Sequence, residues 1–259
     1  MKIINKYYNL KELNKKIVLI SDIHYYDKKD IKLLNAVLER ISKIKPDYIC
    51  IPGDITDISN ISDEDEYIDW FKNLSKISKI IITLGNHEYY IRKSEKKFGI
   101  NEKFLSKLKR IDNVYLLRNE SKSFDGINFI GIDLGIDYYY DEYNSNINIR
   151  KYILKDDYNV LLCHSPVDID KIVNNNDVNL VLCGHMHGGV VPRILRPIFK
   201  NSGIISPTKR LFPKYAYGLK IVGNSKVVTT SGIRIISRIN KFYLFTNFFH
   251  SEIVILKKL

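Results

Sequence analysis

The strongest constraint on the fold of this chain is an alternation along the sequence. Short apolar runs alternate with segments whose apolar residues recur at helical spacing. Residues 31–44 and 64–77 carry apolar side chains at helical spacing and predict amphipathic helices. The apolar runs predict strands at 16–20, 47–52, 80–84, 128–132, 159–163, 179–183 and 252–256, and a hairpin over 217–230 that turns at Gly223 and Asn224. Strands that alternate with helices imply βαβ units, so we expect one α/β domain over residues 1–259.

The cysteines and the N-terminal residues indicate the cellular compartment. Cys50, Cys163 and Cys183 lie within or at the end of apolar runs, and an odd number without a spacing pattern predicts buried, reduced thiols. The first sixteen residues lack the apolar core of a signal peptide, and no segment reaches the ~18 apolar residues of a membrane span. We therefore expect a cytoplasmic protein.

The formal net charge of +12 belongs entirely to the C-terminal third. Residues 178–259 contain thirteen Lys and Arg against one acidic residue, Glu252, whereas basic and acidic residues balance over 1–177. An excess of this kind, confined to one part of a chain, indicates contact with an anionic partner.

Polar residues that can bind metal follow five of the predicted strands. They are Asp22 and His24, then Asp54, then Asn86 and His87, then His164, and finally His185 and His187. In open α/β sheets, ligands bind outside the carboxyl ends of the strands, so we expect these side chains to converge. Gly53, Gly85 and Gly184 each precede one of these polar residues, which fits a chain that turns sharply and leaves room beside the backbone.

The mixture of residue types indicates which ions the site would hold. Neutral imidazoles combined with carboxylates favour Mn, Fe or Zn, whereas an all-oxygen set would favour Mg or Ca. The candidates outnumber the ligands of one ion, so two ions fit better. In sites with ions about 3.5 to 4 Å apart, one carboxylate can bridge both, and a shared hydroxide can attack phosphorus in line with the leaving group.

The ordered motifs D-x-H, G-D-x-x-D, G-N-H-E, H and G-H-x-H resemble those of the calcineurin-like metallophosphoesterases. They run from Asp22 to His187. In YAYGLK, SGI and SEIVIL, the C-terminal region is similar to a bacterial phosphodiesterase branch that includes UDP-2,3-diacylglucosamine pyrophosphatases. The resemblance implies a four-layer α/β/β/α sandwich with a dinuclear metal site at the C-terminal ends of the strands.

The resemblance also implies a role for each matching residue. One ion would be held by Asp22, His24, Asp54 and His187, and the other by Asp54, Asn86, His164 and His185. Asp54 would bridge the two ions. His87 would stay off the metals and orient the phosphate or protonate the leaving oxygen.

Other polar residues near these motifs are expected to have structural roles. Asp57 and Glu88 would orient a turn or a ligand imidazole by accepting hydrogen bonds, and Glu88 could instead cap the segment after it. Asp133 and Asp137 follow another strand, but we expect no catalytic role for them. His250 lies outside every motif and is expected at the surface.

Residues 190–215, directly after the last motif, predict an ordered substrate lid. Four prolines and the absence of periodicity argue for an ordered loop or lid. The candidates for binding a second phosphate are basic side chains: Arg193, Arg196, Lys209 and Arg210. The alternative is that each simply belongs to a solvated basic surface.

Residues 233–249 interleave aromatic with basic side chains. This pattern is typical of a segment that lies at an anionic membrane surface. Buried strands would explain part of it, and single-stranded nucleic acid is the competing polyanion, although no nucleic-acid-binding motif is present.

Together these patterns predict a metal-dependent phosphodiesterase or pyrophosphatase. It would act on a lipid-linked or nucleotide-sugar-lipid substrate, peripheral to the inner membrane face, by attack of metal-bound hydroxide. The alternatives are a nuclease or cyclic-nucleotide phosphodiesterase with the same site, and a non-catalytic metal-binding scaffold. We expect no protein partner.

Overall fold

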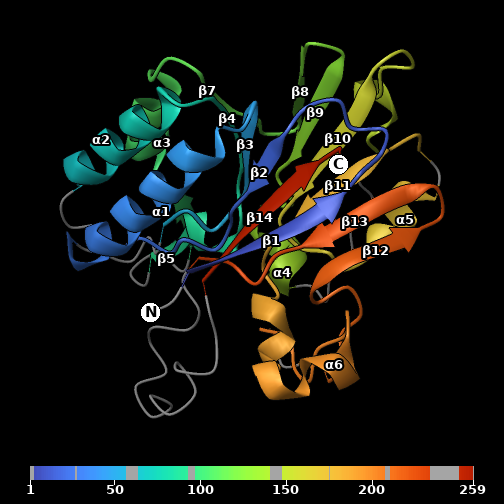
Figure 1. Cartoon of the computed structure of the whole chain (residues 1–259). Helices are drawn as coiled ribbons and strands as arrows, with labels where there is room; N and C mark the ends of the chain where they lie inside the picture. Colours follow the sequence, from blue (N-terminus) through green and yellow to red (C-terminus); the bar gives the residue numbers. More distant parts are fainter. Residues whose placement is uncertain are drawn as a thin grey trace.

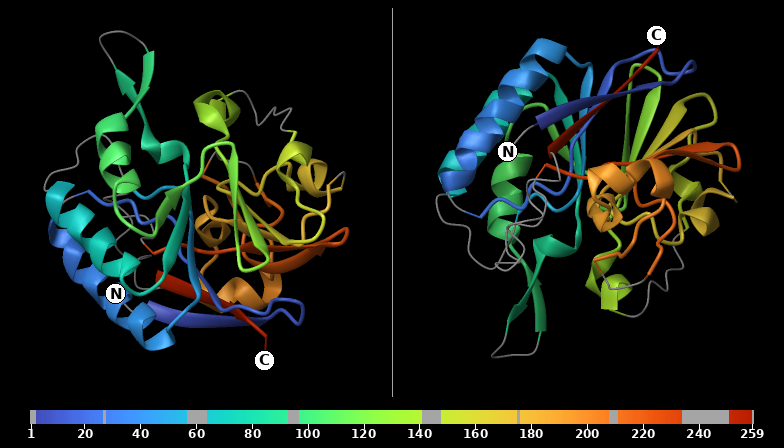
Figure 2. Two further views of the ribbon diagram at one scale, coloured as in Figure 1. Left: turned by 90° about the horizontal axis from the view of Figure 1, so that it is seen from above. Right: turned by 60° about the horizontal axis from the view of Figure 1, so that its bottom comes forward.

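The computed structural model describes residues 3–26, 28–56, 64–92, 97–140, 148–174, 176–207, 211–233 and 251–258. In these ranges two six-stranded sheets pack face to face, and helices cover the outer face of each sheet (Figures 1 and 2). A two-stranded hairpin of β5 (Tyr89–Arg92) and β6 (Lys97–Ile100) projects from this body (Figure 2).

The first sheet contains the predicted strands of the N-terminal half and the predicted final strand. Its order is β1 (Ile3–Asn9), β14 (Ser251–Lys257), β2 (Ile17–Leu19), β3 (Tyr48–Pro52), β4 (Lys79–Thr83) and β7 (Val114–Leu116). Strands β2, β3, β4 and β7 are parallel, and β14 runs antiparallel to β2 but parallel to β1. The carboxyl ends of β2, β3 and β4 therefore lie at one end of the sheet.

The second sheet contains the remaining strands. Its order is β12 (Gly218–Val222), β13 (Ser225–Thr229), β11 (Leu180–Cys183), β10 (Tyr158–Cys163), β9 (Ile127–Ile132) and β8 (Glu120–Phe124). The four central strands are parallel. Strands β12 and β13 form the predicted antiparallel hairpin around Gly223 and Asn224.

Helices α1 (Ile31–Ile44), α2 (Glu64–Ser75) and α3 (Glu102–Lys109) cover the first sheet, and α5 (Ile169–Val173) packs on the second (Figure 1). Helices α4 (Gly135–Tyr140) and α6 (Arg196–Phe199) lie near the strand ends. The described ranges also contain 3-10 turns: η1 (Lys28–Asp30), η3 (Asn86–Glu88), η4 (Arg150–Tyr152), η5 (His187–Val190) and η6 (Arg193–Leu195).

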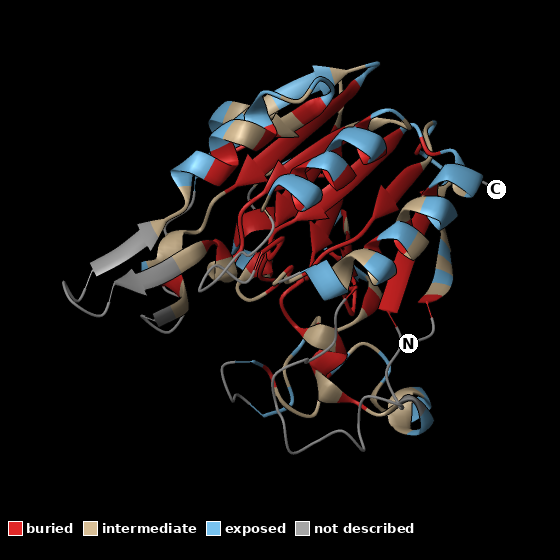
Figure 3. Cartoon of the chain, turned by 90° about the vertical axis from the view of Figure 1, so that its left-hand side faces the viewer, coloured by how far each residue is buried: buried red, intermediate tan, exposed pale blue. Residues whose placement is uncertain are grey.

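Alternation of apolar side chains along each strand creates the layers. In β2, Ile17 and Leu19 enter the core between the sheets, while Val18 packs against the helices. In β10, Leu162 enters the inter-sheet core and Leu161 packs on the opposite side. Successive side chains of a strand point to opposite faces, and the central strands are buried on both faces (Figure 3). Their side chains must therefore be apolar on both faces. The predicted four-layer α/β/β/α sandwich is confirmed.

The three cysteines are buried in these cores and are not paired with one another. Cys50 lies between the sheets, and Cys163 and Cys183 lie in the outer core of the second sheet. Burial raises the pKa of the Cys163 thiol to about 12, so the thiol stays protonated near neutral pH. The predicted burial of the three thiols is confirmed.

The sequence did not predict β5, β6 or β7, nor the edge strands β1 and β8. Most side chains of β1 and β8 are only partly buried or exposed, so neither of these two segments forms an apolar run. Helix α2 also ends at Ser75, two residues before the predicted Ile77. Within the described ranges, every helix is too short or too polar to cross a membrane.

Candidate metal centre

The predicted metal-binding residues meet at the carboxyl ends of the parallel strands of both sheets. Asp22 and His24 follow β2, Asp54 follows β3, and Asn86 lies in the 3-10 turn η3 after β4. From the second sheet, His164 follows β10, and His185 and His187 follow β11. These loops lie on the lower side of Figure 1, near α4 and α6.

One group of candidate ligands joins the loops after β2 and β11. Ligand atoms of Asp22, His24 and His187 all lie within 4.8 Å of one another. Oδ1 of Asp22 is 4.0 Å from Nε2 of His24 and 3.8 Å from Nε2 of His187. These separations leave room for an ion between the three side chains.

A second group, Asp54, His164 and His185, lies deeper and is buried throughout. Oδ2 of Asp54 is 3.0 Å from Nε2 of His164. The same oxygen is 3.6 Å from Nε2 of His24, and Asp54 also forms a group with His24 and His87. Asp54 is therefore the carboxylate that connects the two halves of the site.

Buried atoms without hydrogen bonds test whether the site suits metal ions. Nδ1 of His164 lies 2.6 Å from the carbonyl oxygen of Pro52, which leaves Nε2 directed to the site. Oδ1 of Asn86 is buried and makes no hydrogen bond, and Nε2 of His164 faces the Asp54 carboxylate. Buried polar atoms are nearly always paired, so the unpaired Asn86 oxygen and the His164–Asp54 pair fit coordination to divalent cations.

The backbone is strained at most of these residues. Five of the seven predicted ligands have φ in the left-handed region: Asp22 (51°), His24 (48°), Asp54 (50°), His185 (66°) and His187 (44°). Such residues cost about 1 kcal/mol or more each and persist where surrounding structure holds them. Here His24 N–H donates to Asp54 O (3.0 Å), and His185 N–H donates to Asp22 Oδ1 (2.9 Å).

Two glycines allow the loops to approach so closely. A Cβ atom at Gly85 would overlap Oδ1 of Asp54, and one at Gly184 would overlap the side chains of Ser21 and Asp22. Only glycine, which has no Cβ atom, therefore fits directly before Asn86 and directly before His185.

Glu88 ties the loops after β3 and β4 together. Its buried carboxylate accepts hydrogen bonds from the N–H groups of Gly85 (2.6 Å), Asp54 (2.9 Å) and Thr56 (3.1 Å). It thus caps its own 3-10 turn and fixes the backbone of Asp54. Burial and the nearby Asp54 carboxylate raise the pKa of Glu88 to about 7.

The pKa directions suit metal ligands. Burial holds the pKa of His24 and of His185 well below the usual value, so both imidazoles are neutral. Burial alone would raise the pKa of Asp54, but the imidazoles of His164 and His87 outweigh it and hold that pKa well below the usual range. For His164, the Asp54 carboxylate outweighs burial and raises the pKa to about 9. An ion would therefore displace a proton from His164.

His87 lies beside the ligand groups and is half-buried. Its backbone N–H donates to Oδ1 of Asp54 (2.8 Å), and its ring meets the His24 ring edge-on with centroids 4.4 Å apart. Tyr139 of α4 was not predicted, yet its ring centroid lies 5.2 Å from that of His185. The tyrosines that follow GID (135–137) are the sequence signal that could have indicated it.

Among the residues that were expected not to bind metal, Asp133 has structural contacts, as Glu88 does. Asp133 accepts hydrogen bonds from the Tyr89 hydroxyl (2.6 Å), Arg118 Nε (3.1 Å) and the Gly135 N–H (3.0 Å). Asp137 is exposed in the first turn of α4. The predictions for Asp57 and His250 lie outside the described residues.

The predicted lid is described in part. Arg196 donates to the carbonyl oxygens of Gly188, Lys200 and Ser202, and its guanidinium lies 4.4 Å from the Tyr217 ring centroid. These contacts hold the start of the lid against the last metal loop. Two other predicted phosphate-binding residues, Lys209 and Arg210, lie outside the described residues, as does the side chain of Arg193.

The predicted membrane-interface segment, 233–249, lies outside the described residues except for Ile233. Ile233 is fully buried, and its N–H donates to the carbonyl oxygen of Ser21 (2.9 Å). The chain therefore passes directly beside the first metal loop before it enters that segment.

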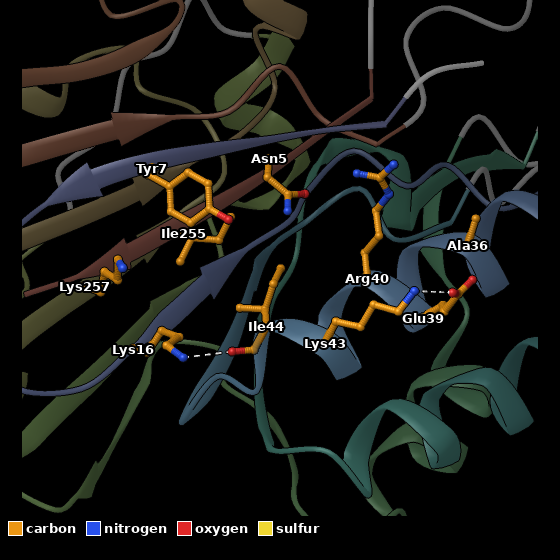
Figure 4. A pocket seen from close by; sticks show the side chains of 10 residues that line it. All are labelled: Asn5, Tyr7, Lys16, Ala36, Glu39, Arg40, Lys43, Ile44, Ile255 and Lys257. Atoms are coloured by element: carbon orange, nitrogen blue, oxygen red, sulfur yellow. Dashed lines mark hydrogen bonds and ion pairs between the residues drawn. The ribbon is translucent and has the colours of Figure 1, made fainter. Parts of the chain in front are cut away.

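A pocket of about 640 Å³ lies away from the candidate metal centre, between β1, β14 and α1 (Figure 4). Lys16, one of its lining residues, lies before the start of β2, whereas the candidate ligands Asp22 and His24 lie after the end of that strand. The pocket and the metal centre are therefore at opposite ends of β2. Lys16 Nζ donates to the carbonyl oxygen of Ile44 (2.8 Å), and Lys43 pairs with Glu39 (2.6 Å). Two of its cations are thus already paired within the pocket.

Known proteins resemble this chain in sequence. An uncharacterized metallophosphoesterase of Helicobacter pylori is 30% identical over 222 residues, which are 84% of this chain and 54% of that protein. One from Campylobacter jejuni is 30% identical over 188 residues, 71% of this chain and 46% of that protein. The chain thus spans about half the length of these curated relatives.

A solved structure, described as that of a novel archaeal phosphodiesterase, covers 84% of both chains at 15% identity. Its TM-score of 0.45 is too low to support an inference about activity. The family model described as calcineurin-like phosphoesterase matches residues 15–189, which include every predicted metal ligand. The chain belongs to the calcineurin-like phosphoesterase family, whose members bind divalent metal ions.

Proposed function

We propose that this chain hydrolyses phosphoesters with two divalent metal ions held on either side of Asp54. The position of Asp54 carries the proposal, because one carboxylate oxygen lies 3.6 Å from Nε2 of His24 and 3.0 Å from Nε2 of His164. Those two imidazoles belong to different ligand groups. A carboxylate between two such groups can bridge a pair of ions, as two-metal phosphoesterases require.

The proposed ligands divide between the two ions as the family resemblance implies. Asp22, His24 and His187 would hold one ion, and Asn86, His164 and His185 the other, with Asp54 shared. The nitrogen and oxygen donors suit Mn, Fe or Zn. Two such ions, when bound, would activate a water molecule and neutralise charge on the phosphoryl oxygens.

The chain's own side chains would position the substrate and supply a proton. His87 is half-buried, lies beside the His24 ring and has its backbone fixed by Asp54. We propose that His87 donates a proton to the departing oxygen, or donates a hydrogen bond that orients the phosphate. Glu88 would keep the Asp54 backbone in place without contacting substrate.

The substrate class we favour is a phosphodiester or pyrophosphate linkage on a lipid-linked or nucleotide-sugar-lipid molecule, as in the diacylglucosamine pyrophosphatase branch. Such a substrate would be met at the inner membrane face by a cytoplasmic, peripheral protein. The net positive charge of residues 178–259 supports an anionic surface as the partner. Arg193, Arg196, Lys209 and Arg210 stay proposed as ligands of a second anionic group.

Metal-dependent hydrolysis of bis(p-nitrophenyl) phosphate tests the proposal. Metal-free protein should be inert, Mn²⁺ should restore activity, and Asp22→Asn should lower it by about 100-fold or more, because even residues outside the ligand set cost 10–100-fold. Asp137→Asn, at an exposed position, is the matched control and should retain activity. Metal-loaded protein that is inert on lipid, nucleotide-sugar and nucleic-acid phosphoesters alike would instead identify a non-catalytic scaffold. Preference for nucleic acid would favour the nuclease alternative.

A further inference from the structure

Large apolar side chains are exposed on the segment that follows the metal loops. Ile194 is 80% exposed, Ile198 75%, Leu211 68% and Phe212 65%. Three other large apolar side chains in the described part of the chain are exposed: Tyr7, Leu154 and Ile221. The four residues of the lid, here called the apolar tip, thus form the main concentration of exposed apolar surface in those ranges.

The apolar tip belongs to one hydrogen-bonded unit. Ile194 in η6 and Ile198 in α6 are four residues apart, about one helical turn. Leu211 pairs with Ile205 in an antiparallel bridge, and the Phe212 N–H donates to the carbonyl oxygen of Ile204 (3.0 Å). Regular backbone structure therefore positions these exposed side chains.

This unit is attached directly to the last metal loop. The Ile204 N–H donates to the carbonyl oxygen of Gly189 (2.8 Å), and the Arg196 guanidinium donates to that of Gly188. Gly188 and Gly189 follow His187, a proposed ligand. In Figure 1, α6 lies at the lower edge of the molecule, beyond the strand ends where the ligands gather. A surface that meets the apolar tip would consequently lie next to the metal centre.

The charge of the segment indicates what that surface is. Residues 190–215 contain six Lys and Arg and no acidic residue. Of these, Lys200 and Lys214 are exposed in the described ranges. Exposed apolar side chains in a segment whose charged residues are all basic match the boundary between acyl chains and headgroups of an anionic bilayer. A second copy of the chain, with the same net charge of +12, would be repelled.

We propose that the apolar tip inserts into the headgroup region of an anionic lipid bilayer and brings the metal centre to the bilayer surface. Ile194, Ile198, Leu211 and Phe212 enter the apolar boundary, while Lys200 and Lys214 meet lipid phosphates. The lipid-linked substrate rests on the proposed function, but binding to lipid requires no turnover. The two can therefore fail separately.

Vesicle co-sedimentation of the full chain tests the insertion. Wild-type protein should bind vesicles of phosphatidylcholine and phosphatidylglycerol at about 7:3, and bind pure phosphatidylcholine less well. Leu211→Ser combined with Phe212→Ser should weaken binding to the anionic vesicles by at least about tenfold, because two apolar side chains no longer leave water. Ile221→Ser is the matched control, since Ile221 on β12 is 68% exposed, as Leu211 is.

A fluorescence readout locates the insertion without removing apolar surface. The chain has one tryptophan, Trp70, which is buried between the first sheet and the helices that cover it. Phe212→Trp should give an emission that shifts to the blue on vesicles and is quenched by brominated lipid. Ile221→Trp should show neither change.

Several results would overturn the proposal. Equal vesicle binding by wild type and the double serine variant would do so. A loss of vesicle binding in Ile221→Ser as large as that in the double variant would also overturn it. A dimer in solution that dissociates in the double variant would show that a second copy covers the apolar tip. Wild type that hydrolyses bis(p-nitrophenyl) phosphate but ignores vesicles would refute the insertion alone, whereas bound but inert protein would refute only the proposed function.

Discussion

His164 and Asp54 face each other across the two sheets, with Nε2 of the imidazole 3.0 Å from Oδ2 of the carboxylate. His164 follows β10 of the second sheet, and Asp54 follows β3 of the first. Both side chains are buried, and Nδ1 of His164 is held by the carbonyl oxygen of Pro52. The pair therefore fixes the spacing of the sheets at the point where the two candidate ligand groups meet.

Metal binding should weaken as pH falls. In the metal-free protein the Asp54 carboxylate raises the pKa of His164 to about 9, so the imidazole carries a proton at neutral pH. An ion must displace that proton, and the apparent affinity for Mn²⁺ should fall by about tenfold per pH unit below that pKa. Calorimetric titration at several pH values in buffers of different ionisation enthalpy measures both affinity and released protons. Affinity that does not change between pH 6 and pH 8 would contradict the assignment.

His87→Gln should separate two roles of His87. If the imidazole protonates the departing oxygen, the loss in kcat should reach about 10²- to 10⁴-fold for diesters with alkyl leaving groups. The loss should be much smaller for p-nitrophenolate, which departs without a proton. An equal loss for both kinds of substrate would indicate that His87 orients the phosphate instead. Metal content should stay unchanged, because His87 is not assigned to either ion.

Gly184→Ala should damage the site through steric overlap. A Cβ atom at Gly184 would collide with the side chains of Ser21 and Asp22, so the loops after β2 and β11 must separate. We expect a loss of about 1 to 3 kcal/mol in the free energy of unfolding together with weaker metal binding. Gly126→Ala is the control: its φ of +77° strains any other residue, but nothing lies within 4 Å. It should lower stability and leave metal affinity and activity intact.

Glu88→Gln should weaken metal binding although Glu88 is not assigned to an ion. The carboxylate accepts three backbone N–H groups, whereas an amide offers one acceptor oxygen and places its NH₂ against the remaining donors. We expect metal affinity to fall by about 10- to 100-fold. Glu39→Gln removes an exposed carboxylate that pairs with Lys43 and should change nothing measurable. Unaltered metal affinity in Glu88→Gln would show that the Asp54 loop is held by other contacts.

The sequence predicted the parts of this protein that depend on local pattern. Apolar spacing over 31–44 predicted α1 with both ends correct, and the order of the polar motifs predicted that they would converge. The edge strands β1 and β8 were missed, because their half-exposed side chains form no apolar run.

Contacts between segments that are distant along the chain could not be predicted from the sequence. The sequence left several structural roles open for Glu88, and its three hydrogen bonds exist only because the loops after β3 and β4 are adjacent. The engagement of Arg196 with Gly188 and Tyr217, and the approach of Tyr139 to His185, likewise arise from tertiary packing. Left-handed backbone at Asp22 or His187 has no sequence signal, since neither is glycine.

Metal stoichiometry of the wild type and of Asp54→Asn tests the shared carboxylate most directly. Elemental analysis combined with low-temperature electron paramagnetic resonance of Mn²⁺-loaded protein should show two ions per chain with the coupling of a close pair. Asp54→Asn should bind no more than one ion tightly and lose hydrolysis of bis(p-nitrophenyl) phosphate, while Asp137→Asn should match wild type. A single uncoupled ion in the wild type, or two coupled ions in Asp54→Asn, would contradict the dinuclear centre.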